Sequence, residues 1–472
     1  MNINKFTVPQ EEIEKQKEYT ALAAELLSRA YPDESPKAYV HTYGCQGNVS
    51  DGERLQGMLR DMGYVFTDTP EDADLVLYNT CAIREHAEDR VFGNVGALKP
   101  IKKKNPGLLI ALCGCMMQQQ SVADKIRSSY SFVDLVFGTH VLHKLPEFIY
   151  RRLSTGKRVI DITESDGVIA ENLPVKRDSV FRAWVPIMYG CNNFCSYCIV
   201  PYVRGRERSR HFDDVIAEVR DVVSKGYKEI TLLGQNVNSY NKDLEKEKQF
   251  PALLKAISEI EGDFIVRFMT SHPRDCTRDL LDVMASSDKI AKHLHLPFQS
   301  GNDRVLKEMN RHYDREKYLS LIDYAYSVMP ELSITSDVIV GFPGETYEEF
   351  CDTLSLIEKV KYTSLFTFIF SPRPGTKAYT MEDPVSREEK GKWFKELTDL
   401  QESIAGRRTA SMLGKTYRVL VEGKAKGEGM LSGRTEGNVI IEFPGDESLI
   451  GNFAFVKVTN PRTWIVYGEI SE

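Results

Sequence analysis

Three cysteines lie close together near the middle of the chain, with the spacing C-x-x-x-C-x-x-C. They are Cys191, Cys195 and Cys198, and we call them the loop triad. Iron–sulfur clusters favour thiolate ligands, and short spacing lets one loop supply several of them. A four-iron cluster on three cysteines keeps one iron open to an outside ligand, so the triad predicts a reactive cluster. The alternative is a zinc knuckle, which needs a fourth ligand, and no further cysteine or histidine follows before His211.

A second set of cysteines is spread over the first part of the chain. Cys45, Cys81 and Cys115 each follow a short apolar run that predicts a β-strand, and we call them the strand-end triad. Ligands gather at the carboxyl ends of parallel strands, so we expect these thiols to converge on a second cluster site. A single such cysteine is more often a small buried hydrophobe. Cys113 competes with Cys115, but it lies within the apolar run, and Gly114 allows the turn that presents the next residue.

The composition predicts a soluble protein of several domains. The chain has 472 residues, of which 42% are hydrophobic and 27% charged, and it is too long for one ordinary core. No apolar run reaches the roughly 18 residues of a membrane span, and no signal-peptide pattern is visible, so we expect a cytoplasmic protein. Nine cysteines then favour metal or redox chemistry over disulfides, although the isolated Cys276 and Cys351 are expected to be structural. The net charge of −7 restricts any nucleic-acid-binding surface to a local patch.

The order of strand and helix patterns predicts an α/β multidomain fold. After an N-terminal helical extension at 1–36, alternating strands and helices at 37–153 predict a parallel α/β sandwich. A turn-rich stretch at 154–180 is expected to be a linker. Six strand–helix units at 181–410 predict a partial (β/α)6 barrel, with its active site at the C-terminal strand ends. Closely spaced short strands at 411–472 predict a small antiparallel β-barrel. Its expected strands are 417–421, 438–443, 453–459 and 463–470.

The loop triad, with Tyr197 before its last cysteine, resembles the signature of radical S-adenosylmethionine (SAM) enzymes. The stretch 199–205 and the pair Ser209 and Arg210 resemble the methylthiotransferases of that superfamily. Three further motifs do so as well: Tyr43-Gly-Cys-Gln46, Asn79-Thr-Cys81 and Gly114-Cys-Met-Met-Gln118. The chain is similar to the MiaB-type tRNA methylthiotransferase family from about residue 37 to its end.

The resemblance implies a methylthiotransferase domain, a radical SAM core and a C-terminal TRAM domain that binds RNA. It implies SAM and two [4Fe-4S] clusters: one on the loop triad that cleaves SAM, and an auxiliary one on the strand-end triad that carries or donates sulfur. The implied reaction adds a methylthio group to carbon 2 of isopentenyl-adenosine next to the tRNA anticodon. That carbon has no acidic proton and no leaving group, so radical chemistry from a cofactor is needed. The implied partners are tRNA and an electron donor such as flavodoxin or ferredoxin, with the enzyme a monomer away from membranes.

Two glycine-containing turns are candidate SAM contacts, because glycine permits close approach of the backbone to a ligand. The alternative is that both are ordinary turns between a strand and a helix. The candidate residues after the second and fifth barrel strands are Gly234, Gln235, Asn236, Gly341, Gly344 and Glu345.

Arginines beside the loop triad are candidate RNA contacts. Arg204, Arg206, Arg208 and Arg210 alternate along the chain, which predicts a phosphate-facing edge, although Glu207 among them is also compatible with a solvated charged loop. The last domain has no excess of basic residues, so its RNA contacts rest on the resemblance alone. The candidates there are Arg418, Arg434 and Arg462.

Two other functions stay open at this point. One is the same chemistry on threonylcarbamoyl-adenosine in tRNA or on a ribosomal protein. The other is a non-catalytic iron–sulfur protein that binds RNA, which would not cleave SAM.

Overall fold

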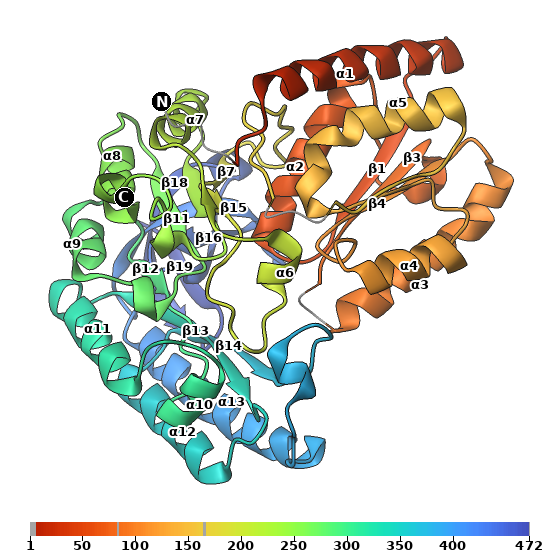
Figure 1. Cartoon of the computed structure of the whole chain (residues 1–472). Coiled ribbons are helices and arrows are strands. Elements are labelled where there is room, and N and C mark those ends of the chain that lie inside the picture. The colour runs from red at the N-terminus through yellow and green to blue at the C-terminus, as the bar shows by residue number, and fades with distance from the viewer. Residues whose placement is uncertain (1–5, 83–84, 164–166, 472) are drawn as a thin grey trace. The chain divides into compact units, whose positions relative to one another are not determined.

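The computed structural model describes residues 6–82, 85–163 and 167–471 (Figure 1). The first five residues of the expected N-terminal extension lie outside these ranges. Arg84, the first residue of a helix that the sequence pattern predicts over 84–99, also lies outside them. The chain divides into two compact units. The first unit consists of Met1–Asp178, Met188–Asn192 and Cys198–Arg208, and the second of Ser179–Ile187, Asn193–Tyr197 and Ser209–Glu472. No helix in the described ranges is long and apolar enough to cross a membrane.

A six-stranded parallel sheet forms the centre of the first unit, in the order β2-β1-β3-β4-β5-β6. Its strands are β1 (Lys37–Thr42), β2 (Val65–Phe66), β3 (Leu75–Thr80), β4 (Leu109–Gly114), β5 (Leu135–Phe137) and β6 (Val159–Asp161). Its helices are α1 (Gln10–Ala30), α2 (Gln46–Asp61), α3 (Glu85–Lys104), α4 (Gln120–Ser129) and α5 (Leu145–Thr155). α1, α2 and α5 pack on one face and α3 and α4 on the other, which confirms the predicted sandwich (Figure 1).

The stretch expected to be a linker belongs largely to this unit. It contributes β6 to the sheet, and Ile169 pairs with Thr7. Further along, the backbone N–H of Lys176 donates to the carbonyl of Glu53 on α2, at 2.9 Å. β6 was not predicted from the sequence because it has only three residues.

The second unit contains six parallel strands, in two three-stranded sheets ordered β11-β10-β7 and β12-β13-β14. The strands are β7 (Arg182–Pro186), β10 (Glu229–Leu233), β11 (Ile265–Phe268), β12 (His293–His295), β13 (Ser333–Val340) and β14 (Ser364–Ile369). The helices after them are α7 (Phe212–Ser224), α8 (Phe250–Ser258), α9 (Arg278–Ser286), α10 (Asp303–Glu308), α11 (Arg315–Val328), α12 (Tyr347–Val360) and α13 (Arg387–Ala410). An isolated bridge between Val266 and Ile290 links the two sheets, so the strands form the expected partial barrel.

A closed five-stranded barrel completes the second unit, in the order β15-β16-β17-β19-β18. Its strands are β15 (Thr416–Lys424), β16 (Met430–Thr435), β17 (Ile440–Pro444), β18 (Phe453–Pro461) and β19 (Val466–Ile470). The predicted small β-barrel is confirmed, but it is not antiparallel throughout, because β17 and β19 pair in parallel. β16 was not expected, because Ser432, Gly433 and Arg434 weaken its apolar pattern. Inward-facing residues such as Val419, Leu431 and Phe443 are buried in its core.

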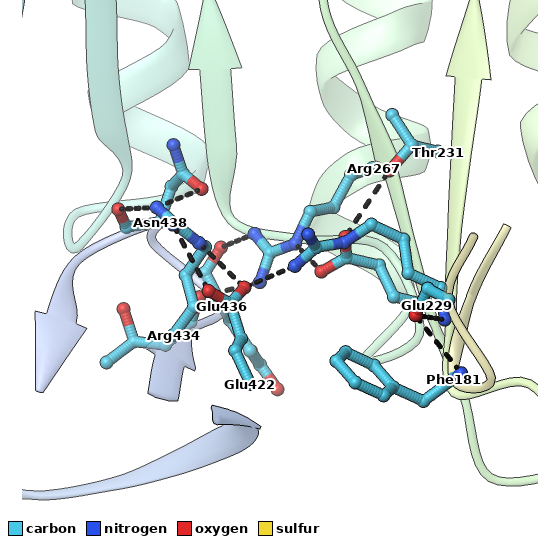
Figure 2. A network of polar contacts seen from close by, with 11 residues as sticks. Phe181, Glu229, Thr231, Arg267, Glu422, Arg434, Glu436 and Asn438 are labelled. Atoms are coloured by element: carbon cyan, nitrogen blue, oxygen red, sulfur yellow. Dashed lines mark hydrogen bonds and ion pairs between the residues drawn. The ribbon is translucent and has the colours of Figure 1, made fainter. Parts of the chain in front are cut away.

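A chain of buried and partly buried charges joins this small barrel to the strands of the larger one (Figure 2). Glu229, the first residue of β10, accepts hydrogen bonds from Arg267 at 2.8 Å and from Arg182 at 2.5 Å. These cations hold the pKa of Glu229 below its usual value although burial opposes this. Arg182 also pairs with Glu422 of the small barrel, which in turn binds Arg434. The alternating signs let each charge lie beside an opposite one, which the buried Glu229 and Arg267 require.

Arg267 extends this contact to the turn between β16 and β17. Its guanidinium donates to the carbonyls of Thr435, at 2.8 Å, and Glu436, at 3.1 Å. In the same turn, a Cβ on Gly437 would lie 3.3 Å from the side chain of Ser333, at the start of β13. The turn therefore packs against the N-terminal ends of the barrel strands, away from their C-terminal ends.

Replacing Arg267 by methionine should lower the free energy of unfolding of the second unit by about 3 kcal/mol, because it leaves the buried Glu229 short of a partner. Urea unfolding followed by tryptophan fluorescence measures this unit selectively. All three tryptophans of the chain, Trp184, Trp393 and Trp464, belong to it.

Lys395→Met is the matched control, since it removes an exposed partner of Asp399 on α13. Exposed ion pairs contribute little, so its unfolding curve should stay close to that of the wild type. Equal curves for the two variants would show that the buried charge chain does not stabilise the unit.

Candidate functional site

The strand-end triad lies at one edge of the six-stranded sheet. Cys81 and Cys115 come directly after β3 and β4, and Cys45 follows β1 and immediately precedes α2. β1, β3 and β4 are neighbours in the sheet, so their carboxyl ends present the three cysteines together. Cys45 is exposed, whereas Cys81 and Cys115 are buried.

The backbone around this triad is closely packed. Gly44 has φ +103°, and a Cβ there would lie 2.6 Å from Cys81 Sγ. Gly114 has φ +96°, and a Cβ there would lie 2.5 Å from the carbonyl oxygen of Thr80. Only glycine tolerates both this conformation and this space, so these two positions let the loops carrying Cys45 and Cys115 approach β3.

The thiols of the strand-end triad lie within one another's electrostatic field. Burial raises the pKa of the Cys115 thiol to about 12, Arg204 opposes this, and Cys45 and Cys81 add to it. A positive group is therefore needed to hold several thiolates here, and a metal cluster is such a group. The donor set fits iron–sulfur ligation, in which each cysteine binds a different iron.

Cys113 and Cys115 have different surroundings. Cys113 lies in β4 with no exposed surface and belongs to the apolar core beneath α1, α2 and α5. Burial raises its pKa well above the usual value. Cys115 packs instead with Ala82, Ile199 and Val203, beside the other two thiols. These positions support Cys115 as the third ligand.

The described residues contain no group of three or more His, Cys, Asp or Glu arranged around a single metal ion.

The loop triad is held by backbone contacts on each side. In the first unit, the N–H of Cys191 donates to the carbonyl of Gly205 at 3.1 Å, and a Cβ on Gly190 would lie 2.0 Å from the carbonyl oxygen of Arg206. In the second unit, Asn310 donates to the carbonyls of Asn193 and Phe194, both at 3.0 Å.

Arg311 contacts a cysteine of the loop triad directly. Its Nη1 lies 3.3 Å from Cys195 Sγ, and its Nη2 donates to the carbonyl of Pro297 at 2.7 Å. Arg311 is buried, and Tyr313 Oη accepts from its Nε at 3.2 Å. The guanidinium is thus oriented from several sides and supplies a positive charge where a thiolate is expected.

Polar side chains gather just beyond the C-terminal ends of the barrel strands. They follow β10, β11, β12 and β13, and each has a buried atom without a hydrogen-bond partner among the described residues. The atoms are Asn236 Oδ1, both amide atoms of Asn238, Ser271 Oγ, His272 Nε2, Gln299 Oε1 and Glu345 Oε1. A buried polar atom without a hydrogen bond lowers the stability of the fold, unless a ligand or water supplies the missing partner. In barrels of this kind, the C-terminal ends of the strands carry the active site.

Backbone strain occurs at the same place. Thr270 and Gln299 both have φ +66°, a conformation that is rare for residues other than glycine. Strained residues cluster at ligand sites. Sequence analysis missed Asn238, Ser271, His272 and Gln299, although each lies only a few residues after a predicted strand, which was the available signal.

The candidate SAM turns are part of this end of the barrel. Asn236 is buried and donates to Asp275 at 2.7 Å, while the carbonyl of Gly234, next to Gln235, accepts from Thr270 at 2.6 Å. Glu345 accepts from the N–H of Gly341 at 2.7 Å, which closes the second turn on itself.

Burial raises the pKa of Glu345 to about 7, although its backbone hydrogen bonds lower it. Gly341 has no room for a side chain, since a Cβ would lie 2.4 Å from Lys390, whereas the space at Gly344 is open. Glu345 therefore stabilises the turn through its hydrogen bond to Gly341, and the backbone at Gly344 is accessible to a ligand.

The structure does not place the four candidate arginines after the loop triad on one exposed edge. Arg206 is exposed, but Arg204, Arg208 and Arg210 are buried. Arg208 donates to the carbonyls of Arg204 and Arg206, and Arg210 pairs with Glu218. The expected edge was inferred from spacing, and spacing does not reveal which of these side chains other elements cover.

Of the candidate arginines in the small barrel, two pair with carboxylates and one is exposed. Arg418 pairs with Asp263 and lies 3.6 Å from the ring centre of Phe453, and Arg434 pairs with Glu422. Arg462 is exposed. A role of Arg418 or Arg434 in RNA binding stays a prediction, and it would compete with these carboxylates.

Three family models match separate parts of the chain. They are the radical SAM superfamily at residues 185–357, an uncharacterized protein family, UPF0004, at 37–138, and the TRAM domain at 410–470. Among solved structures, the chain is similar in fold to a radical SAM methyltransferase, TsrM, from Kitasatospora setae. With cobalamin and a [4Fe-4S] cluster bound, that structure has a TM-score of 0.53 and 14% identity, covering 73% of this chain and 77% of the other.

Proteins related in sequence have a much higher identity to this chain than that structure has. A protein of Thermoanaerobacter sp. (strain X514) is 48% identical over 468 residues, 98% of each chain. One of Clostridium perfringens (strain SM101 / Type A) is 50% identical over 434 residues, which is 92% of this chain and 97% of the other. Both are named tRNA-2-methylthio-N(6)-dimethylallyladenosine synthase. Identity at this level over nearly the full length, with all three domain models in order, means that the chain belongs to the tRNA-2-methylthio-N(6)-dimethylallyladenosine synthase family of radical SAM enzymes.

Proposed function

We propose that this protein attaches a methylthio group to carbon 2 of isopentenyl-adenosine next to the anticodon of tRNA, giving 2-methylthio-isopentenyl-adenosine. The observation that carries the proposal is the presence of two cysteine triads in one chain of this family. The loop triad occupies the radical SAM domain, and the strand-end triad lies at the edge of the N-terminal sheet. A radical generator alone needs only the first.

Each triad has a distinct role in this proposal. The loop triad would hold the [4Fe-4S] cluster that supplies the electron for SAM cleavage, and the strand-end triad would hold an auxiliary [4Fe-4S] cluster that supplies sulfur. Arg311 orients and balances the thiolate of Cys195. The buried polar atoms beyond β10–β13 would bind SAM or the substrate base, with Gly344 leaving the backbone accessible.

The proposed partners follow from the chemistry. The substrate is tRNA, for which the TRAM domain and the exposed Arg206 and Arg462 are candidate contacts. Radical SAM chemistry consumes electrons, so a flavodoxin or ferredoxin would supply them in the cytoplasm. We expect the enzyme to act as a monomer.

Nucleoside analysis of tRNA from a strain lacking this gene tests the substrate. Isopentenyl-adenosine should accumulate and its 2-methylthio derivative should disappear, and both should return when the wild-type gene is restored. A change in threonylcarbamoyl-adenosine derivatives instead would reassign the substrate. Unchanged tRNA together with a lost ribosomal-protein modification would point to the other branch of methylthiotransferases.

A further inference from the structure

We propose that Arg204 is a positioning residue of the auxiliary cluster, which raises the reduction potential of that cluster by donating a hydrogen bond to the Cys115 thiolate. Arg204 Nε lies 3.1 Å from Cys115 Sγ. The inference rests on the proposed function, since it requires a cluster on the strand-end triad. From its spacing in the sequence, Arg204 was predicted to contact RNA.

Arg204 is held in place by two further buried groups of the first unit. Its Nη2 donates to Asn48 Oδ1 and to Asp51 Oδ2, both at 2.7 Å. The arginine is 6% exposed, Asn48 is 0% exposed and Asp51 is 4% exposed. A guanidinium fixed at both ends in this way cannot turn toward solvent, so its Nε stays directed at the cysteine.

Asn48 connects this arrangement to the backbone of the strand-end triad. Its amide nitrogen donates to the carbonyls of Tyr43, at 2.8 Å, and Thr80, at 2.9 Å. Tyr43 and Thr80 lie just before Cys45 and Cys81. The single asparagine therefore ties the two loops to each other and presents its oxygen to Arg204.

The segment that carries Arg204 packs tightly against the same loops. Arg204 ends the short helix α6 (Val200–Arg204), which follows Cys198 within the first unit. Ile199 and Val203 form an apolar cluster with Ala82 and Cys115, and Thr139 donates to the carbonyl of Val203 at 2.5 Å. These contacts hold α6 against the loop that carries Cys115, and they thereby fix the position of the Arg204 guanidinium.

A hydrogen bond and a positive charge at a cluster sulfur favour the reduced state, which carries one more negative charge. Burial strengthens this effect, because little solvent screens the charge. Asp51 compensates part of it but also keeps the guanidinium in place. Lysine would keep the charge without the fork of donors, so it could not satisfy Cys115, Asn48 and Asp51 together.

The test uses full-length protein in which the loop triad is replaced by alanine, so that any remaining cluster belongs to the strand-end triad. Arg204→Gln and Arg204→Lys are added separately to this background. Iron content is measured first, and the cluster is then titrated against potential by electron paramagnetic resonance. At a fixed potential, Arg204→Gln should lower the ratio of reduced to oxidised cluster about tenfold, which is about 59 mV for a one-electron couple, and Arg204→Lys should lower it less.

Arg152→Gln is the matched control in the same background. Arg152 forms a partly buried pair with Asp134 in the first unit, at 2.9 Å, and has no hydrogen bond to a cysteine among the described residues. It should leave the potential unchanged, which separates an effect at the sulfur from a general loss of packing. If Arg204→Gln does not retain iron, the reduction potential of the cluster in Arg204→Lys is compared with that of the background protein. A lower potential in Arg204→Lys supports the role of Arg204, and an unchanged potential contradicts it.

The outcomes separate this inference from the proposed function. A background protein without iron would overturn the auxiliary cluster, and the role of Arg204 with it. An iron-loaded background whose potential is the same with Arg204, Gln and Lys would overturn the role of Arg204 alone and leave the auxiliary cluster standing.

Discussion

Replacing Cys191, Cys195 and Cys198 together by alanine should reduce SAM cleavage to the uncatalysed background. The three thiolates are the expected ligands of the cluster that delivers the electron to SAM, and no other side chain in that loop can bind iron through sulfur. The measurement is the release of methionine and deoxyadenosine under anaerobic conditions with dithionite as the reductant. The methylthiolated nucleoside should also be absent.

The matched control is Cys351→Ala, which removes a partly exposed cysteine on α12 that belongs to neither triad. It should cleave SAM at the wild-type rate. Continued SAM cleavage by the triple variant would contradict the assignment of the loop triad, and it would reopen the possibility of a different ligand set.

Replacing Cys45, Cys81 and Cys115 together should have the opposite pattern. SAM cleavage should continue, because the radical SAM domain and the loop triad are unchanged, but no methylthio group should reach the tRNA. The measurement combines iron content, SAM cleavage products and nucleoside analysis of the same reaction. We expect about half of the wild-type iron, since one of two four-iron clusters is lost.

Cys113→Ala distinguishes the two candidates for the third ligand. Cys113 is buried in β4 and packs in the core, so its replacement should cost some stability but preserve both iron and product. Cys115→Ala should lose the product. The reverse result would exchange the two cysteines and would remove the basis for the role of Arg204.

Local sequence was sufficient where the chemistry depends on residue type and spacing. The loop triad could be identified because its three thiolates lie in one short loop. The strand-end triad required one further step, since its members are far apart in sequence. Parallel strands bring their carboxyl ends to one edge, and the apolar runs before Cys45, Cys81 and Cys115 marked those ends. The structure places the three cysteines after neighbouring strands, and their binding of a cluster stays a prediction.

Prediction was weaker where an element carries a short or interrupted apolar pattern. β6 has three residues, and β16 is interrupted by Ser432 and Gly433, so neither was expected. β6 pairs with β5 at the edge of the six-stranded sheet, and β16 pairs with β15 and β17 within the closed barrel. Both strands are stabilised by hydrogen bonds and packing that a local pattern does not reveal.

The contacts of two buried arginines were the hardest to predict from the sequence. Arg204 contacts Cys115, 89 residues away in sequence, and Asp51, 153 residues away. Arg267 reaches Thr435 across 168 residues. From sequence, each of these is a basic residue that could equally face solvent or RNA.

The sequence by itself therefore identified the family and predicted the two cysteine triads and the order of the domains, because these depend on residue types at short range and on strand order. Only the tertiary structure decided that Arg204 lies beside Cys115 Sγ, that Arg267 and Glu229 join the two barrels of the second unit, and that Ser271, His272 and Gln299 gather beyond the strand ends. The physical reason is burial. A charge or polar atom removed from water must find its partner within the fold, and that partner is set by packing between segments far apart in the chain.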